Sequence, residues 1–188
     1  MNIFDIAKQN QEKAWQVIKN TNIIQIWEDA GAKINLVGSL RTGLLMKHRD
    51  IDFHIYSSPL NLADSFLAMA RLAENPSIKR IECANLLHTS EACIEWHAWY
   101  QNEENELWQM DMIHIREGSR YDGYFEKVAQ RISEIMTDEI RETILRLKYE
   151  TPETEKIIGV EYYQAVLRDG VRIIADLRNG ESSILLRE

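Results

Sequence analysis

The chain of 188 residues has few of the residues that mark disulfide-rich or zinc-binding proteins. It contains two cysteines, Cys83 and Cys93, and none of its five histidines is spaced for metal binding with a cysteine or another histidine. A structural zinc site needs four such ligands, and a small disulfide scaffold needs several cysteine pairs. We therefore expect two buried thiols, with neither a disulfide framework nor a zinc site.

Long apolar runs and an excess of positive charge are also missing. No stretch approaches the roughly 20 apolar residues that a membrane span requires, and the first residues lack the basic patch and apolar segment of a signal peptide. The net charge is −8, whereas a broad grip on DNA or RNA needs a basic surface. These absences predict a cytoplasmic protein without membrane contact, whose partner is a small or cationic molecule or another protein.

The pattern of apolar residues predicts helices at both ends of the chain and strands between them. Short polar connections between the last three strand-like runs favour antiparallel neighbours. We expect Trp15 and Trp27 of the first helices, and Phe66 and Leu67 of a later one, on or near buried faces. The expected helices cover 3–30 with a break at 20–22, 61–74, 122–136, 138–150 and 159–178, with one helical turn at 44–46, and the expected strands cover 33–37, 50–56, 78–87, 92–100 and 107–115.

The composition suits such a packed protein, because 45% of the residues are hydrophobic and 28% are charged, as in ordinary soluble globular domains. The fold class that we predict is α/β (α+β), with a mixed β-sheet core and flanking helices. The core covers residues 1–118, and a C-terminal helical lobe covers residues 119–188.

The most informative stretch runs from Leu36 to Tyr56 and joins two strands through a glycine-containing loop. Alternation along the second strand places Asp50 and Asp52 on one side of it, opposite its apolar residues. Two carboxylates so close repel each other unless a cation neutralises them, and Mg²⁺ prefers carboxylate and water ligands. The turn at Gly38 and Ser39, just upstream, offers N–H groups and a hydroxyl to phosphate oxygens. This stretch therefore predicts a metal-nucleotide site.

The spacing of these residues carries a family resemblance. Gly38-Ser39, ten intervening residues and then D-I-D-F from Asp50 resemble the G-[GS]-x(9–13)-D-h-[DE]-h signature, where h is apolar, of the DNA polymerase beta-like nucleotidyltransferase superfamily. The resemblance implies a mixed-sheet nucleotidyltransferase core and transfer of a nucleoside monophosphate from a triphosphate, such as ATP, to an acceptor hydroxyl. It also implies that Asp50 and Asp52 bind Mg²⁺ or Mn²⁺.

The superfamily usually supplies a third carboxylate from a later strand. Asp111 is a single acid in the apolar run L-W-Q-M-D-M-I-H-I, and a buried carboxylate there needs a cation, a donor or water. The resemblance therefore implies Asp111 as the third catalytic and metal-binding acid, with Glu95 as the alternative. It implies phosphate binding by Gly38 and Ser39, and we add Arg41 because it closely follows the serine.

Three alternatives remain open from the sequence. His54 shares a side with the acid pair, where it either orients the acceptor or lies on the rim of the site. Thr42 and Arg49 depart from residues common in small members of the superfamily, which leaves room for an inactive nucleotide-binding or protein-interaction module. The same acids could also serve a metal-dependent phosphohydrolase that uses water as the acceptor.

Overall fold

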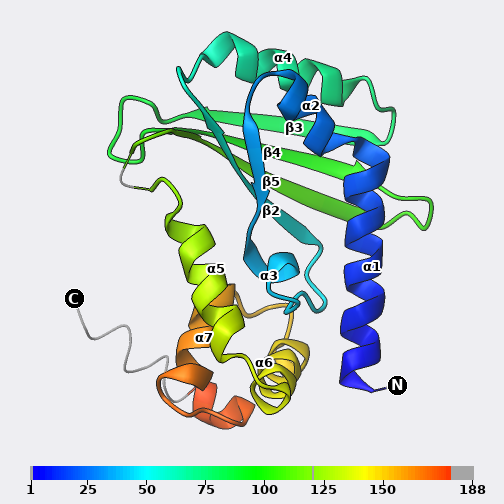
Figure 1. The fold of residues 1–188 in the computed structure, drawn as a ribbon. Helices are drawn as coiled ribbons and strands as arrows, with labels where there is room; N and C mark the ends of the chain where they lie inside the picture. The colour runs from blue at the N-terminus through cyan, green and yellow to red at the C-terminus, as the bar shows by residue number, and fades with distance from the viewer. Residues whose placement is uncertain (1, 120, 179–188) are drawn as a thin grey trace.

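The computed structural model describes residues 2–119 and 121–178 of the chain (Figure 1). Within these residues the strands form one five-stranded sheet in the order β1-β2-β5-β4-β3. Strands β2 and β5 are parallel and the other neighbouring pairs are antiparallel, which confirms the predicted mixed sheet. The strands are β1 (Lys33–Leu36), β2 (Asp50–Ser57), β3 (Ile78–Asn85), β4 (Cys93–Gln101) and β5 (Leu107–Arg116).

One face of the sheet is covered by three helices, α1 (Ile3–Thr21), α2 (Ile23–Asp29) and α4 (Leu62–Ala73) (Figure 1). The break between α1 and α2 falls at Asn22, which has a left-handed φ of 53° that asparagine tolerates better than most residues. Helix α4 connects β2 to β3 at the far edge of the sheet. The other face of β2 and β5 is free of these helices.

The chain after the sheet forms a helical lobe with a hydrophobic core of its own. Its helices are α5 (Tyr124–Ile135), α6 (Asp138–Glu150) and α7 (Gly159–Leu167). Leu44 and Met46 also belong to this second core, so the division into residues 1–118 and 119–188 stays a prediction. Residues 120 and 179–188 of the predicted lobe lie outside the described residues.

The link between β1 and β2 differs from the prediction of a helical turn at 44–46. The helical turn lies earlier, in α3 (Gly38–Arg41), and residues 44–46 form a loop. Leu45 packs into the core beside the sheet, whereas Leu44 and Met46 pack into the core of the lobe. Side chains that alternate between two cores require an extended backbone, which is why these apolar residues do not form a helix.

One of the two thiols that were expected to be buried is exposed. Cys93 is buried, whereas Cys83 is exposed on β3, the edge strand of the sheet.

Two further expectations were wrong. Trp15, Phe66 and Leu67 are 49%, 50% and 62% exposed, because the buried stripes of α1 and α4 are supplied by other residues of those helices. The predicted helix over 159–178 is interrupted: α7 ends at Leu167, Gly170 adopts a φ of +71°, and helical structure resumes at 174–178. In the described part of the chain, no helix has both the length and the apolar character needed to span a bilayer.

Candidate active site

The three predicted aspartates lie on the same face of the sheet. Asp50 and Asp52 are separated by Ile51, whose side chain is buried in the core on the opposite face. Strands β2 and β5 run parallel, with Asp52 directly beside Asp111, and neighbouring strands in register present paired residues on the same face. The carboxylates therefore occupy the face that α1, α2 and α4 leave free.

Gly38 allows the turn at the start of α3 to approach Asp52. A Cβ atom added at Gly38 would lie 1.9 Å from Asp52 Oδ2, and the Gly38 φ of +66° is a left-handed value that favours glycine. The adjacent backbone N–H of Ser39 donates a hydrogen bond to the Asp52 carboxylate. The glycine and serine of the sequence signature are thus in direct contact with its second aspartate.

The electrostatics of this pair are unfavourable without a positive charge. Burial and, after it, the charges of Asp50 and Asp111 together raise the pKa of Asp52 to about 7, against opposing effects of Lys148 and the Ser39 N–H. Asp50 Oδ1 is buried and has no hydrogen-bond partner among the described residues. Such an atom is costly unless a cation or donor reaches it.

The donor set at Asp50 and Asp52 suits a hard divalent cation. Mg²⁺ typically keeps several waters and binds through one or two carboxylates plus substrate phosphates. Two aspartates beside the Gly38-Ser39 turn match this kind of site. As the side chains stand, no three acidic, histidine or cysteine residues in the described ranges are arranged to hold a metal ion. The fit to Mg²⁺ therefore rests on the carboxylates of Asp50 and Asp52 and on Asp50 Oδ1, which has no hydrogen-bond partner among the described residues. Asp111 lies on the neighbouring strand.

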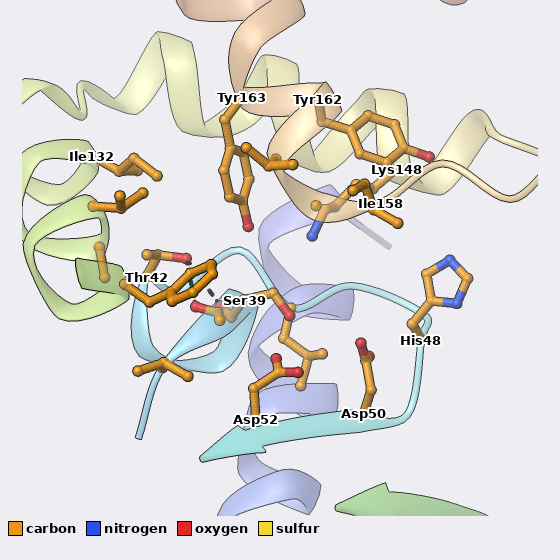
Figure 2. A pocket seen from close by; sticks show the side chains of 18 of the residues that line it. Ser39, Thr42, His48, Asp50, Asp52, Ile132, Lys148, Ile158, Tyr162 and Tyr163 are labelled. Carbon is orange, nitrogen blue, oxygen red and sulfur yellow. Dashed lines mark hydrogen bonds between the residues drawn. The ribbon is translucent and has the colours of Figure 1, made fainter. Parts of the chain in front are cut away.

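Lys148 is a buried cation above the acid pair. It comes from α6, is 6% exposed, and its Nζ donates to the Leu44 carbonyl at 3.0 Å. Burial lowers the pKa of Lys148 to about 8, although Asp50 and Asp52 oppose this shift. Figure 2 shows its ammonium entering from the lobe above the two carboxylates.

The sequence analysis did not assign Lys148 to the site. The sequence spacing could have indicated that Lys148 is buried. Lys148 lies four residues after Ile144, a residue of the lobe core, and therefore on the same side of α6. A lysine on an apolar helix face needs a partner when it is buried. Only the docking of the lobe shows that its hydrogen-bond partner is the Leu44 carbonyl and that its charge acts on the two aspartates.

A pocket of about 700 Å³ opens over the acid pair, between the sheet and the lobe. Of the six predicted site residues, it brings together Gly38, Ser39, Asp50 and Asp52. Arg41 is exposed on α3 and does not line this pocket, so its predicted role in phosphate binding stays untested. The rest of the wall is largely apolar and comes mainly from the loop after α3 and the helical lobe: Leu45, Met46, Phe125, Val128, Ala129, Ile132, Ile157, Ile158 and Val160.

Asp111 lies beside the pocket and is held by hydrogen bonds. His97 Nδ1 lies 2.5 Å from Asp111 Oδ1, and Gln109 Nε2 donates to the same oxygen at 2.7 Å. His97 is the direct neighbour of Asp111 on β4. The sequence analysis missed this contact, because it depends on the register of β4 against β5.

Two other candidates from the sequence lie farther along the strands. Glu95 pairs with Ile113, two residues beyond Asp111, and it lines a smaller pocket of about 170 Å³ together with Glu91 and His54. His54 also lines the larger pocket, and burial lowers its pKa, although Glu126 opposes this shift. Glu95 is therefore displaced from the aspartate pair along the sheet, whereas Asp111 is next to it.

Three basic side chains near the sheet are paired with glutamates. Arg49 and Lys13 both contact Glu106 at 2.9 Å, and Arg80 pairs with Glu82. The positive charge of these three residues is thus offset locally.

Comparison with protein families and with curated proteins finds no match for this sequence. Comparison with solved structures finds the Cid1 poly(U) polymerase bound to MgGTP, with a TM-score of 0.62 and 11% identity over 88% of this chain and 53% of that one. The non-canonical poly(A) polymerase GLD-2, in complex with GLD-3, gives a TM-score of 0.59 and 8% identity over 89% and 58%. A cytoplasmic RNA terminal U-transferase gives 0.54 and 14% over 85% and 46%.

These structural neighbours are nucleotidyltransferases of the DNA polymerase beta-like superfamily. The chain has the fold of that superfamily, as the signature around Gly38 and Asp50 predicted. It spans about half the length of the solved chains that it matches.

Proposed function

We propose that this protein is an Mg²⁺- or Mn²⁺-dependent nucleotidyltransferase that moves a nucleoside monophosphate from a triphosphate to an acceptor hydroxyl. The observation that carries the proposal is the pair of half-buried aspartates, Asp50 and Asp52, in contact with the Gly38-Ser39 turn and overlain by Lys148. A triphosphate with its metal would supply the compensating charges that this pocket lacks. The neighbouring structures include Cid1 bound to MgGTP and Cid1 in complex with a UTP analogue, which agrees with this class of ligand.

Each residue has a defined part in this reaction. Ser39 and the backbone at Gly38 bind the β and γ phosphates, and the Lys148 ammonium neutralises phosphate charge. Asp50 and Asp52 would hold a divalent ion, which would supply Lewis-acid stabilisation of the reacting phosphate. Asp111 accepts the proton of the acceptor hydroxyl, whose oxygen forms a bond to the α phosphorus while the bond to pyrophosphate breaks. Most of the rate enhancement comes from positioning and from charge neutralisation.

A small molecule or a protein is the acceptor that we propose, rather than a long nucleic acid. The chain carries a net charge of −8, and Lys13, Arg49 and Arg80 are already paired with glutamates. Glu91 and Glu95 line the second pocket. Such a surface repels a polyanion, although the neighbours named above include RNA-extending enzymes.

Calorimetric titration with Mg²⁺ and a non-hydrolysable ATP analogue tests the proposal. We expect binding by the natural protein and loss of binding when Asp50→Asn and Asp52→Asn are combined. The matched control combines Asp29→Asn with Asp64→Asn, which removes the same charge from the helices on the opposite face. An isotherm unchanged by the first pair, or equally weakened by the second, would contradict the proposed site.

Product analysis separates transfer from the alternatives. Labelled ATP should yield pyrophosphate together with an adenylylated acceptor when candidate acceptors are supplied. Free AMP without a labelled acceptor indicates the hydrolase instead. Binding of ATP with no turnover under any acceptor indicates the inactive module.

A further inference from the structure

The third aspartate is held by one of its two oxygens. Both His97 Nδ1 and Gln109 Nε2 approach Asp111 Oδ1, at 2.5 and 2.7 Å. An ionised carboxylate only accepts hydrogen bonds, so the imidazole Nδ1 carries the proton and donates it. Neither contact uses Oδ2.

This arrangement opposes the repulsion within the acid group. Asp111 lies directly beside Asp52 in the sheet, and its charge contributes to the raised pKa of Asp52. Like charges at this separation push a mobile carboxylate away from its neighbours. Two charge-assisted hydrogen bonds, each stronger than a neutral one, restrain the Asp111 side chain on the side of β4 and β5.

The imidazole is itself restrained by its neighbours on the open face. The rings of His97 and Trp99 have centroids 6.2 Å apart, and the Arg80 guanidinium lies 4.5 Å above the Trp99 ring. A planar cation stacked on an aromatic ring fixes both groups. The contacts thus extend from β3 through Trp99 to His97 and then to Asp111.

We propose that His97 is a positioning residue for Asp111: with Gln109, it holds Oδ1 and leaves Oδ2 directed to the divalent ion and the acceptor. The inference rests on the proposed function, because it assigns Asp111 to the metal site. Partners that orient a metal-binding carboxylate typically change metal affinity by about 10- to 100-fold when they are removed. His97 therefore contributes to metal binding without touching the metal.

Two substitutions separate the hydrogen bond from the packing of the ring. His97→Phe keeps an aromatic ring of similar size and removes the donor. His97→Asn loses the ring, but its amide nitrogen can occupy about the position of Nδ1 and still donate. The side chain of His97 is 31% exposed, so both variants should fold, and circular dichroism checks that they do.

The measurement is Mn²⁺ affinity in the presence of a non-hydrolysable ATP analogue, followed by electron paramagnetic resonance of free Mn²⁺. We expect His97→Phe to weaken Mn²⁺ binding by about 10-fold or more and His97→Asn to stay close to the natural protein. A smaller loss in His97→Phe, or an equal loss in both variants, overturns the inference while leaving the proposed function intact. Absence of Mn²⁺ and nucleotide binding by the natural protein instead overturns the proposed function, and the inference with it.

Discussion

Gly38→Ala is the substitution whose effect the structure defines most closely. The new Cβ would lie 1.9 Å from Asp52 Oδ2, a distance that two unbonded atoms cannot keep. The carboxylate must therefore move out of contact with the Ser39 N–H and away from its position beside Asp50. Alanine must also adopt a φ of +66°, which costs about 1 to 2 kcal/mol in a residue with a Cβ.

Gly31→Ala is the matched control for this prediction. Gly31 also has a left-handed φ, +77°, but a Cβ there meets nothing within 4 Å. Both variants should lose about 1 to 2 kcal/mol of unfolding free energy from backbone strain, measured by urea denaturation. Only Gly38→Ala should also lose Mg²⁺-dependent ATP binding, by about 100-fold or more, because displaced oxygens lose both ion and phosphate contacts. Equal nucleotide affinity in the two variants would refute the argument that Gly38 positions Asp52.

Three further predictions concern the titratable side chains of Lys148, Asp52 and His114. Lys148→Met should weaken triphosphate binding by about 10-fold or more, since it removes a desolvated cation from the phosphate pocket, whereas the exposed Lys127→Met should leave the titration unchanged. Asp52→Asn should make the protein more stable at pH 8 by about 2 to 4 kcal/mol. The pKa of Asp52 is raised to about 7, so its charge lowers stability progressively as pH rises above 4. Urea unfolding that shows no gain would contradict the claim that the ionised Asp52 destabilises the fold. His114 is buried between Ser57 and Ser65, and burial lowers its pKa to about 4, so the stability of the neutral form is complete above pH 6.5 and is lost as pH falls toward 4. Between pH 7 and pH 5 the unfolding free energy of the natural protein should therefore fall by about 2 kcal/mol more than that of His114→Gln, and parallel pH profiles would argue against this reasoning.

Local sequence was sufficient to locate the acid pair and the Gly38-Ser39 turn beside it. Gly38, Ser39, Asp50 and Asp52 lie within fifteen residues, and strand alternation alone places both acids on one side. Asp111 could be named because a single acid in an apolar strand needs a partner and because the superfamily has a third carboxylate. Its place beside Asp52 then follows from the parallel register of β2 and β5.

The remaining parts of the site depend on contacts between segments far apart in the chain. Lys148 reaches the aspartates only because α6 docks on the loop at Leu44, where its ammonium finds a carbonyl acceptor. His97 meets Asp111 through the register of β4 and β5, which apolar patterning does not specify to the residue. The loop at 44–46 serves two cores at once, so local helix propensity was overridden by packing.

The exposed aromatic residues show the same limit. The positions of Trp15 and Phe66 were judged from residue type, and large apolar side chains are usually buried. In α1 and α4 the buried positions are taken by other residues, among them the small Ala14 and Ala68, which belong to the core beside the sheet. The period of the apolar residues correctly predicted both helices, but packing against the rest of the protein decides which face of each helix is buried.

The most direct test of the central claim is a crystal structure with Mn²⁺ and a non-hydrolysable triphosphate. We predict an anomalous peak for Mn²⁺ within coordinating distance of both Asp50 and Asp52, with triphosphate oxygens on the Gly38-Ser39 turn and beside Lys148. A bound triphosphate whose metal lies away from both aspartates would contradict the account.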